Sequence, residues 1–562
     1  MRKFMAVLLC MAVLVAGTVF YITSIWTQVP YAEDKNYLII GSEIITDVEE
    51  PLIENGYILL SFNAIKKHID PNAYWDEKLE KVVFTTKDKL ITMKTDKLTA
   101  MVNQKPIDLN VPARVVDGIP YIPIEFLKDI LNIHVELVDD TIAIIDFTKD
   151  TVVTGGLLKE RGLKKDSTLF SPYVTKPLQE GDKVRVFQQV GDWYKVRTKN
   201  GIFGYIEKQY LSINEETVTE PLPQEAVIEP FKPEKGKINM VWEHVIKKNP
   251  DVSKLKAMEG LDIVSPTWFA VIDGKGNVSN NADMEYVKWA HKNGYKVWGL
   301  ATNDFNPDIT HEFLNNTDTR EKIISQLLVY AKLYKLDGIN IDFENIYEKD
   351  KNMLTQFMRE LYPLCREQGL TLSMDVTFIS GSSTWSKCYD RKALAEAVDY
   401  MAVMAYDQHW ASSPKAGSVA QYKWVESNLK KILEQVPAEK VILGMPFYTR
   451  LWEEEKVDGK VKVTSKALSM SAIQKILDEK KPEIIWDEES GQRYAQYTEG
   501  GKIYKVWIED AESIKLKSSL VNKYNLAGAA AWRRGFETED IWPVIAKNLK
   551  KTDSSSQRAQ AN

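Results

Sequence analysis

Two acidic residues, Asp342 and Glu344, lie two positions apart at the end of an otherwise apolar stretch, residues 336–344. Because side chains alternate across a β-strand, both acids share one face with Asn340. The other face is apolar and consists of Ile339, Ile341 and Phe343. Buried carboxyls cost several kcal/mol each unless they are paired or used. The pattern therefore predicts a column of inward-pointing acids that leads to a catalytic site at the end of the strand.

A strand with such a face needs a closed sheet around it, and the rest of the sequence from residue 237 supplies one. Apolar runs of strand length alternate with helical patterns, which is typical of a parallel sheet covered by helices. The runs are residues 238–245, 261–269, 295–301, 336–344, 371–378, 400–406, 440–447 and 526–532. Eight such units predict an α/β fold, a (β/α)₈ TIM barrel over residues 237–548, with functional groups at the carboxyl ends of its strands. The long interval 451–525 predicts an inserted α+β element.

Four strings in this region carry a resemblance. They are Asp337-Gly338-x-x-x-Asp342-x-Glu344, Met404-Ala405-Tyr406-Asp407, residues 444–448 (Gly-Met-Pro-Phe-Tyr) and residues 528–533 (Gly-Ala-Ala-Ala-Trp-Arg). Together they resemble strands four, six, seven and eight of glycoside hydrolase family 18, the chitinase-type hydrolases. Asn340, Phe343 and Asn345 make the fourth strand most similar to the spore-cortex and cell-wall N-acetylglucosaminidase branch.

The resemblance implies a role for each matching residue. Glu344 would protonate the leaving oxygen while the N-acetyl group of the substrate attacks its own anomeric carbon, a substrate-assisted route to retained configuration. Asp342 would orient the acetamide, and Tyr406 would donate a hydrogen bond to its oxygen. Asn340 cannot share a proton with Asp342, as the aspartate at this position in many chitinases is thought to do. The resemblance further assigns the substrate site to Asp337, Asn340, Met404, Asp407 and Trp532.

The implied function is hydrolysis of N-acetylglucosamine-containing glycan, with peptidoglycan as the expected substrate. Two alternatives stay open: a chitinase, and a glycan-binding or adhesion protein on an inactive barrel, against which the presence of Glu344 speaks. No metal or nucleotide motif appears, so no cofactor is expected, and His409 is interpreted as an ordinary loop histidine. Twelve of the fifteen tryptophans lie in the barrel region. Of these, Trp268, Trp298 and Trp410 fit either a sugar cleft or a core.

Two small modules and a linker precede the barrel. Residues 50–148 contain a repeat in which an Asn-Gly or Asp-Gly hairpin, a short helix and two strands recur after 62 residues. It resembles the copper amine oxidase N-terminal-like domain, expected over residues 45–148 as a spacer, and His68 and His134 have no copper-site spacing.

Residues 153–212 resemble a bacterial SH3-like barrel that would contact the cell wall, where Trp193 and Tyr205 fit either a peptide site or a core. An acidic, proline-rich linker is expected over 213–236 and a disordered tail over 549–562.

The amino terminus suggests export. After Arg2 and Lys3, residues 4–26 are uncharged, which is long enough to span a bilayer as a helix. The sequence predicts a single-pass signal anchor over residues 1–27 that places the catalytic domain outside the cytoplasm, at the cell membrane. Secretion after signal cleavage is the alternative.

Charge and cysteine content exclude other classes. The net charge of -6 provides no basic surface for nucleic acid. The three cysteines, Cys10, Cys365 and Cys388, are too few for a disulfide scaffold or a zinc site. Cys365 and Cys388 fit either a disulfide outside the cell or two buried thiols.

Overall fold

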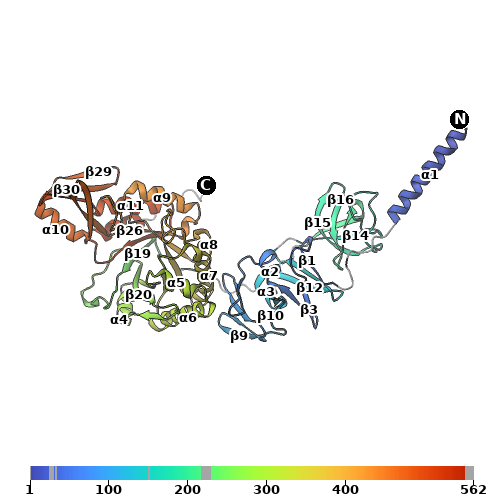
Figure 1. Ribbon diagram of the computed structural model, residues 1–562, viewed down its shortest axis with the longest axis horizontal. Helices are drawn as coiled ribbons and strands as arrows, with labels where there is room; N and C mark the ends of the chain where they lie inside the picture. Colours follow the sequence, from blue (N-terminus) through green and yellow to red (C-terminus); the bar gives the residue numbers. More distant parts are fainter. Residues whose placement is uncertain (1, 25–30, 32–34, 150–151, 217–228, 551–562) are drawn as a thin grey trace. The chain divides into compact units, whose positions relative to one another are not determined.

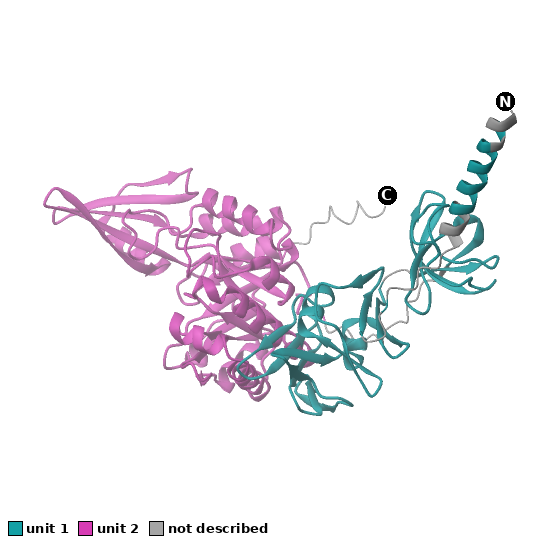
Figure 2. Ribbon diagram, turned by 45° about the vertical axis from the view of Figure 1, so that its right-hand side comes forward, with its two compact units in different colours: residues 1–227 teal, residues 228–562 magenta. Residues whose placement is uncertain are grey.

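The protein is described by a computed structural model in which residues 2–24, 31, 35–149, 152–216 and 229–550 are placed. The chain forms two compact units, residues 1–227 and residues 228–562 (Figure 2). We describe each unit by itself.

The second unit contains a closed barrel of eight parallel strands (Figure 1). The strands are β19 (Ile238–Glu243), β20 (Ile263–Val271), β22 (Lys296–Thr302), β23 (Gly338–Asp342), β24 (Thr371–Thr377), β25 (Tyr400–Met404), β26 (Val441–Pro446) and β32 (Gly528–Trp532). Their order follows the chain, and β19 pairs with both β20 and β32, so the sheet closes. All eight predicted strands are present, and the TIM-barrel prediction is confirmed. One short strand, β21 (Val278–Asn280), adds an antiparallel edge to β20.

Helices between the strands cover the barrel. They are α4 (Met284–Lys292), α5 (Pro307–Leu314), α6 (Thr317–Tyr334), α7 (Lys351–Glu367), α8 (Arg391–Glu396), α9 (Tyr422–Leu433), α11 (Ala511–Lys523) and α12 (Ile541–Leu549). Polar N-caps start several of them; the Asn316 side chain, for example, accepts a hydrogen bond from Thr319 N at the start of α6. Phe343 packs against Phe313 of α5 and Phe357 of α7. The apolar face predicted for residues 339–343 is thus turned toward the helices.

The barrel interior is filled mainly by apolar side chains at alternate strand positions. Ile238, Met240 and Trp242 of β19 belong to this cluster, as do Trp298 and Leu300 of β22. Phe231 also packs on it: its backbone N–H donates to Thr371 Oγ1 and its carbonyl accepts from Tyr400 OH. Phe231 lies inside the predicted linker 213–236, so the catalytic unit begins earlier than residue 237. Residues 213–216 belong to a strand of the first unit, and residues 217–228 lie outside the described part of the chain.

The predicted insertion is a five-stranded antiparallel sheet with one helix, placed between β26 and α11. Its elements are β27 (Tyr448–Val457), β28 (Lys460–Ser469), α10 (Met470–Lys480), β29 (Ile484–Asp487), β30 (Gln492–Glu499) and β31 (Lys502–Ile508). It begins at Tyr448, directly after the seventh barrel strand, so its first strand continues from the rim of the barrel.

The first unit contains the predicted repeat. The hairpins β3–β4 (Leu52–Glu54, Tyr57–Ser61) and β10–β11 (Arg114–Val116, Ile119–Pro123) turn at Asn55-Gly56 and Asp117-Gly118, all four residues with positive φ. The two hairpins pair with each other through β4 and β11. Helix α2 (Phe62–His68) follows the first hairpin, and η1 (Glu125–Leu127) with α3 (Lys128–Leu131) follows the second.

Each half then continues into a sheet of its own. One contains β5 (Tyr74–Asp76), β6 (Lys81–Thr85), β7 (Leu90–Lys94), β8 (Thr99–Val102) and β9 (Lys105–Asp108); the other contains β12 (Ile133–Val138), β13 (Ile142–Phe147), β1 (Tyr37–Ile40) and β2 (Glu43–Ile45). The predicted start at residue 45 therefore omits β1, which pairs in parallel with β13.

A small barrel of five strands completes the first unit: β14 (Val152–Leu157), β15 (Lys183–Val190), β16 (Trp193–Arg197), β17 (Phe203–Glu207) and β18 (Leu211–Glu216). Trp193 is buried, so its aromatic ring belongs to the core, whereas Tyr205 is half-buried. Arg197 Nη2 lies 2.6 Å from Asp146 Oδ2 of β13, and Arg197 Nη1 donates to the Gly41 carbonyl oxygen. This buried ion pair ties the small barrel to the repeat domain.

The amino-terminal helix α1 covers Arg2–Ser24, most of the predicted anchor, whose first residue and last three residues (25–27) lie outside the described part of the chain. Of the helices described, none is long and apolar enough to cross a membrane. Cys365 and Cys388 are both buried free thiols, so they do not form the disulfide that was one of the two options.

Candidate active site

Asp342 and Glu344 lie at the carboxyl end of β23, where the chain leaves the barrel. Asn303, the residue after β22, holds the backbone there: its Oδ1 accepts from Glu344 N at 3.0 Å, and its Nδ2 donates to the Glu344 carbonyl oxygen at 2.7 Å. Asn303 is itself fully buried and donates to Thr310 Oγ1. The position of Glu344 is therefore set by the neighbouring strand as well as by its own. Asn303 is a supporting residue that the sequence analysis missed.

Asn340 lies two residues before Asp342 on β23, deeper in the barrel and on the same face of the strand. Its Oδ1 accepts hydrogen bonds from Trp242 Nε1 at 3.0 Å and from Ser265 Oγ at 3.1 Å. Its Nδ2 donates to Asp375 Oδ1 at 2.8 Å. With both donors on its oxygen, Asn340 must present its amide N–H₂ to β24. Asn340 thus contacts protein groups from three other strands, and the inward direction predicted for this face is confirmed.

Asp375 is a third buried acid that the sequence analysis did not select. It lies on β24, whose residues Ser373 and Met374 pair with Asn340 and Ile341 of β23. Asp375 therefore occupies the level of Asp342 on the adjacent strand, about 4.8 Å away between strand axes. The signal was present in the sequence, because Thr371, Ser373 and Asp375 alternate with apolar residues along β24.

The environment of these acids favours their protonated forms. Burial raises the pKa of Asp342 to about 7, and its Oδ1 atom is buried without a hydrogen-bond partner among the described residues. Burial, and then the charge of Asp342, raises the pKa of Asp375. The pKa of Glu344 is raised well above its ordinary value by burial and by the charges of Asp342, Asp375 and Asp407. Glu344 is therefore suited to remain a proton donor at neutral pH.

Tyr406 follows the sixth strand and faces the same acids. Its hydroxyl has a pKa raised chiefly by burial and further by the neighbouring Tyr448, Asp375, Glu344 and Asp342. The hydroxyl therefore stays protonated at neutral pH and can donate a hydrogen bond. The structure thus brings Asp342, Glu344 and Tyr406 together as predicted.

Met404 and Asp407 flank Tyr406 at the end of β25, where Met404 is half-buried and Asp407 is exposed. Asp407 adopts a positive φ and its Oδ1 accepts a hydrogen bond from Tyr448 OH at 2.5 Å. This hydrogen bond joins Asp407, in the loop after the sixth strand, to Tyr448, the first residue of β27. His409 lies further along this loop, where its Nδ1 contacts the Ser418 carbonyl oxygen at 2.8 Å, in line with the loop role predicted for it.

Trp532 ends the eighth strand and is half-buried. Its ring lies 6.2 Å from the ring of Trp242 and 5.6 Å from that of His244, and it packs on the barrel interior beside Tyr406. The Trp532 indole therefore forms apolar surface at the carboxyl end of the eighth strand. Trp268 and Trp298 are fully buried and belong to the core.

Three other aromatic side chains are exposed on loops that leave the carboxyl ends of strands. Phe305 follows β22, Trp385 follows β24 and Trp410 follows β25, with exposed fractions of 43%, 42% and 51%. Of the three tryptophans that the sequence left between cleft and core, only Trp410 is available to a ligand.

Asp337 is not part of this site, and the prediction that placed it there is wrong. It precedes β23 and accepts a hydrogen bond from Val297 N at 2.9 Å, with Lys296 Nζ at 2.9 Å and His291 Nε2 at 2.8 Å from its oxygens. Asp337 lies five positions before Asp342 in the sequence, about 16 Å away along the strand. Asp337 therefore joins the amino ends of β22 and β23, at the opposite end of the barrel.

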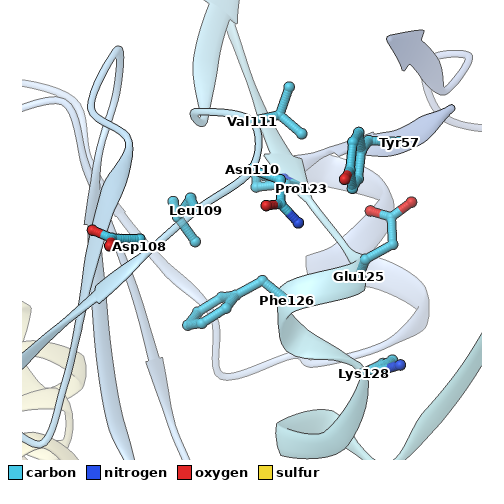
Figure 3. Close-up of a pocket in the computed structure, with 9 residues that line it drawn as sticks. All are labelled: Tyr57, Asp108, Leu109, Asn110, Val111, Pro123, Glu125, Phe126 and Lys128. Atoms are coloured by element: carbon cyan, nitrogen blue, oxygen red, sulfur yellow. The ribbon is translucent and has the colours of Figure 1, made fainter. Parts of the chain in front are cut away.

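A separate cavity of about 240 Å³ lies in the repeat domain of the first unit (Figure 3). Figure 3 shows the Glu125 carboxyl beside the Tyr57 ring on one wall, with Phe126 below them. Glu125 Oε1 accepts from Ile58 N at 2.6 Å, and burial raises the pKa of Glu125. Within the described residues, no group of three or more His, Cys, Asp or Glu side chains is arranged to hold a metal ion. The cavity lining contains two acids, Asp108 and Glu125, and no cluster of buried acids like that of the barrel.

Comparison with known families gives one match for each part of the chain. The family described as glycosyl hydrolases family 18 matches residues 269–537, the copper amine oxidase N-terminal domain matches residues 38–145, and the bacterial SH3 domain matches residues 175–212.

Individual relatives match about half of the chain. The uncharacterized glycosylase YvbX of Bacillus subtilis is 27% identical over 302 residues, which cover 52% of this chain and 85% of that protein. The cortical fragment-lytic enzyme of Bacillus subtilis is 25% identical over 263 residues, or 46% of this chain and 60% of that enzyme. Among solved structures, a chitinase from Chromobacterium violaceum superposes with a TM-score of 0.50 and 24% identity over 56% of this chain and 100% of its own, a likeness of fold.

Proposed function

We propose that this chain, a glycoside hydrolase by its glycosyl hydrolases family 18 domain, cleaves glycans beside N-acetylglucosamine and uses the acetamide of that sugar as the nucleophile. The observation that carries the proposal is Asp342 Oδ1, a buried acceptor without a partner among the described residues, beside an acid held in its protonated form. An acetamide N–H is the donor that such an oxygen lacks.

The proposed reaction uses three side chains. Glu344 gives its proton to the glycosidic oxygen as the bond to the anomeric carbon breaks. Asp342 accepts the acetamide N–H and stabilises the positive charge that develops on that nitrogen, while Tyr406 donates to the acetamide oxygen and turns it toward the anomeric carbon. Water then opens the resulting oxazolinium ring from the face that the leaving group vacated, and it returns a proton to Glu344. The configuration at the anomeric carbon is retained.

Peptidoglycan is the substrate we propose. Three observations support it: the bacterial SH3 domain, the similarity to a cortical fragment-lytic enzyme, and Asn340 in place of the aspartate of many chitinases. Chitin oligosaccharides carry the same acetamide and form the alternative substrate class.

Mass spectrometry of borohydride-reduced digests of purified peptidoglycan tests this. We expect reduced N-acetylglucosamine at the new ends, because the participating acetamide belongs to the sugar whose anomeric carbon is attacked. Reduced muramic acid ends, or turnover of chitin oligosaccharides alone, would overturn the proposed substrate. The Glu344→Gln protein serves as the control for contaminating hydrolases.

The proposed site of action is outside the cytoplasm. The uncharged stretch 4–26 behind Arg2 and Lys3 and the wall-associated type of the small domains support it. Protease added to intact protoplasts should degrade the catalytic domain while a cytoplasmic marker protein survives. Protection of the domain until the cells are lysed would contradict this location.

A further inference from the structure

The three acids at the carboxyl end of the barrel cannot all be ionised easily at neutral pH. Asp342, Asp375 and Glu344 lie on two adjacent strands, and each has a pKa raised by burial. Two buried carboxylates at one level of a sheet repel each other strongly and cannot both ionise easily. At neutral pH the site must therefore keep protons beyond the one that Glu344 donates.

The hydrogen bonds differ between the two deeper acids. Asp375 Oδ1 accepts from Asn340 Nδ2, and the Asn340 amide is fixed in that direction by Trp242 and Ser265. Asp342 Oδ1 has no such donor among the described residues. Burial and the charge of Asp342 raise the pKa of Asp375, whereas its hydrogen bond from Asn340 lowers it. Because donors stabilise the charged form of a carboxyl and Asp342 Oδ1 has none, we assign the first negative charge of the pair to Asp375 and the proton to Asp342.

Substrate reverses that preference. In the proposed reaction, which this inference rests on, the acetamide N–H donates to Asp342, and positive charge develops on the acetamide nitrogen. Asp342 is then the better place for the negative charge. No proton can pass to Asn340, because an amide has no carboxylate to accept it.

We infer that Asp375 is a positioning residue that takes over the part of the missing strand-four aspartate: it shares one proton with Asp342 and receives that proton when substrate binds. The step is balanced, because the Asp342 carboxylic acid and the Asp375 carboxylate become the Asp342 carboxylate and the Asp375 carboxylic acid. No other bond changes, and the proton returns after the product leaves. Asn340 keeps Asp375 oriented throughout.

Other ionisable side chains lie close enough to Asp342 and Asp375 to affect their pKa values. Glu344, Tyr406 and Tyr389 face it from the ends of β23 and β25 and from the loop after β24, and Asp407 acts on Glu344. Both tyrosines have pKa values raised well above neutrality, so they do not titrate in the range of the pair. His244 beside Trp532 has a pKa lowered by burial and by the charge of Arg533, so it also titrates near this range. A change in the pH profile between pH 4 and 8 that appears in Asp375→Asn and is absent from Asp399→Asn therefore reports on the acids, because His244 is present in both variants.

The first test is the pH profile of kcat for Asp375→Asn on the substrate that the wild-type protein cleaves. Without a buried acceptor, Asp342 must lose its proton to water before it can act, so the acid side of the profile should move up by about one pH unit, which lowers kcat about tenfold at acidic pH. KM should change little. A uniform fall of kcat at every pH would mean a structural role and would overturn the inference.

The double variant Asn340→Asp with Asp375→Asn restores a carboxyl beside Asp342, now on its own strand. We expect it to recover the wild-type pH dependence of kcat on the acidic side. The 2.8 Å contact between positions 340 and 375 is kept, with donor and acceptor exchanged. The matched control is Asp399→Asn, a buried aspartate that accepts from Leu372 N and Tyr362 OH at the amino end of β25. Its pH profile should keep the wild-type midpoint. Failure of the double variant to recover this pH dependence, when it is folded, would count against the inference.

A readout without substrate separates this inference from the proposed function. At pH 8, Asp342→Asn and Asp375→Asn each remove the same mutual repulsion, so their effects on Tm should be strongly non-additive in the double variant. Asp342→Asn combined with Asp399→Asn should be additive. Additive effects of the two active-site variants would overturn the pairing even if the enzyme cleaves its glycan. Non-additivity in a protein that cleaves no N-acetylglucosamine glycan would leave the pairing intact and refute only the proposed function.

Discussion

At the residue scale, the chemistry depends on keeping Glu344 protonated without neutralising its surroundings. Burial contributes most to its raised pKa, and the charges of Asp342, Asp375 and Asp407 add to it. Burial alone would raise the pKa of a single carboxyl on this strand, and the neighbouring acids raise it further. The cluster of acids therefore strengthens the proposed role of Glu344 as the proton donor.

We expect Glu344→Gln to lower kcat by at least about a hundredfold, because glutamine cannot protonate the glycosidic oxygen. Glutamine keeps the shape and the backbone contacts with Asn303, so the protein should fold and bind glycan as before. Single-turnover hydrolysis of a soluble N-acetylglucosamine oligosaccharide, together with calorimetric binding, measures both effects. Turnover close to wild type would refute the assignment of the acid.

Asp342→Asn should stabilise the protein in a pH-dependent way. The folded pKa of Asp342 is about 7, whereas its ordinary value is 3.8, so the folded state holds a proton that the unfolded state releases between those values. The resulting destabilisation is absent below pH 4, grows as pH rises and is complete above pH 7. Relative to wild type, the Tm of Asp342→Asn should therefore be a few degrees higher at pH 8 and nearly unchanged at pH 4. An equal gain at both pH values would contradict the assigned pKa.

At the element scale, the helices behind the fourth strand hold the site in place. Arg320 of α6 and Glu360 of α7 form a fully buried ion pair, with Nε–Oε2 at 2.9 Å and Nη2–Oε1 at 2.8 Å. Arg320 Nη1 also donates to the Leu314 carbonyl oxygen at the end of α5. The pair thus joins the three helices on which the outward face of β23 packs.

Removing one partner of this pair should be far more harmful than removing both. Glu360→Ala leaves the buried guanidinium of Arg320 without its carboxylate and should lower the unfolding free energy by about 3–5 kcal/mol. The double variant Arg320→Met with Glu360→Met should lose much less, because no buried charge remains. Urea unfolding followed by tryptophan fluorescence compares them. A double variant as unstable as Glu360→Ala would show that the charge itself is not the cause.

At the scale of the whole molecule, the catalytic unit has its own core and begins at the segment that contains Phe231. Phe231 packs on the interior cluster of the barrel and bonds to Thr371 and Tyr400. This segment belongs to the catalytic unit, although its composition is that of a linker. The boundary between the two units lies close to residue 228.

A fragment of residues 228–562 should therefore fold and cleave soluble oligosaccharides at a rate similar to that of the full chain. A fragment of residues 235–562 lacks Phe231 and should melt several degrees lower, with the same products. Differential scanning calorimetry and initial rates on one soluble substrate test both. If the shorter fragment melts at the same temperature, the contacts of Phe231 do not stabilise the barrel. The longer fragment should lose efficiency only on intact cell wall, if the small domains contact the wall as we propose.

The sequence by itself determined the features that repeat over short distances. Alternation at 339–344 identified the fourth strand and its inward acids, and the eight apolar runs identified the barrel, because strand and helix periodicities are local properties of the chain. The hairpins at Asn55-Gly56 and Asp117-Gly118 were predictable for the same reason, since these pairs accept the positive φ that a tight turn requires.

The tertiary structure decided which residues meet across strands. Asp375 lies in the site because β23 and β24 pair in a register that places it beside Asp342. Asp337 lies outside the site because its motif follows one strand from one end of the barrel to the other. Phe231 and β1 were missed because each packs against elements more than a hundred residues away. Strand register and barrel closure are long-range properties, fixed by the packing of the whole core, so no local pattern in the sequence contains them.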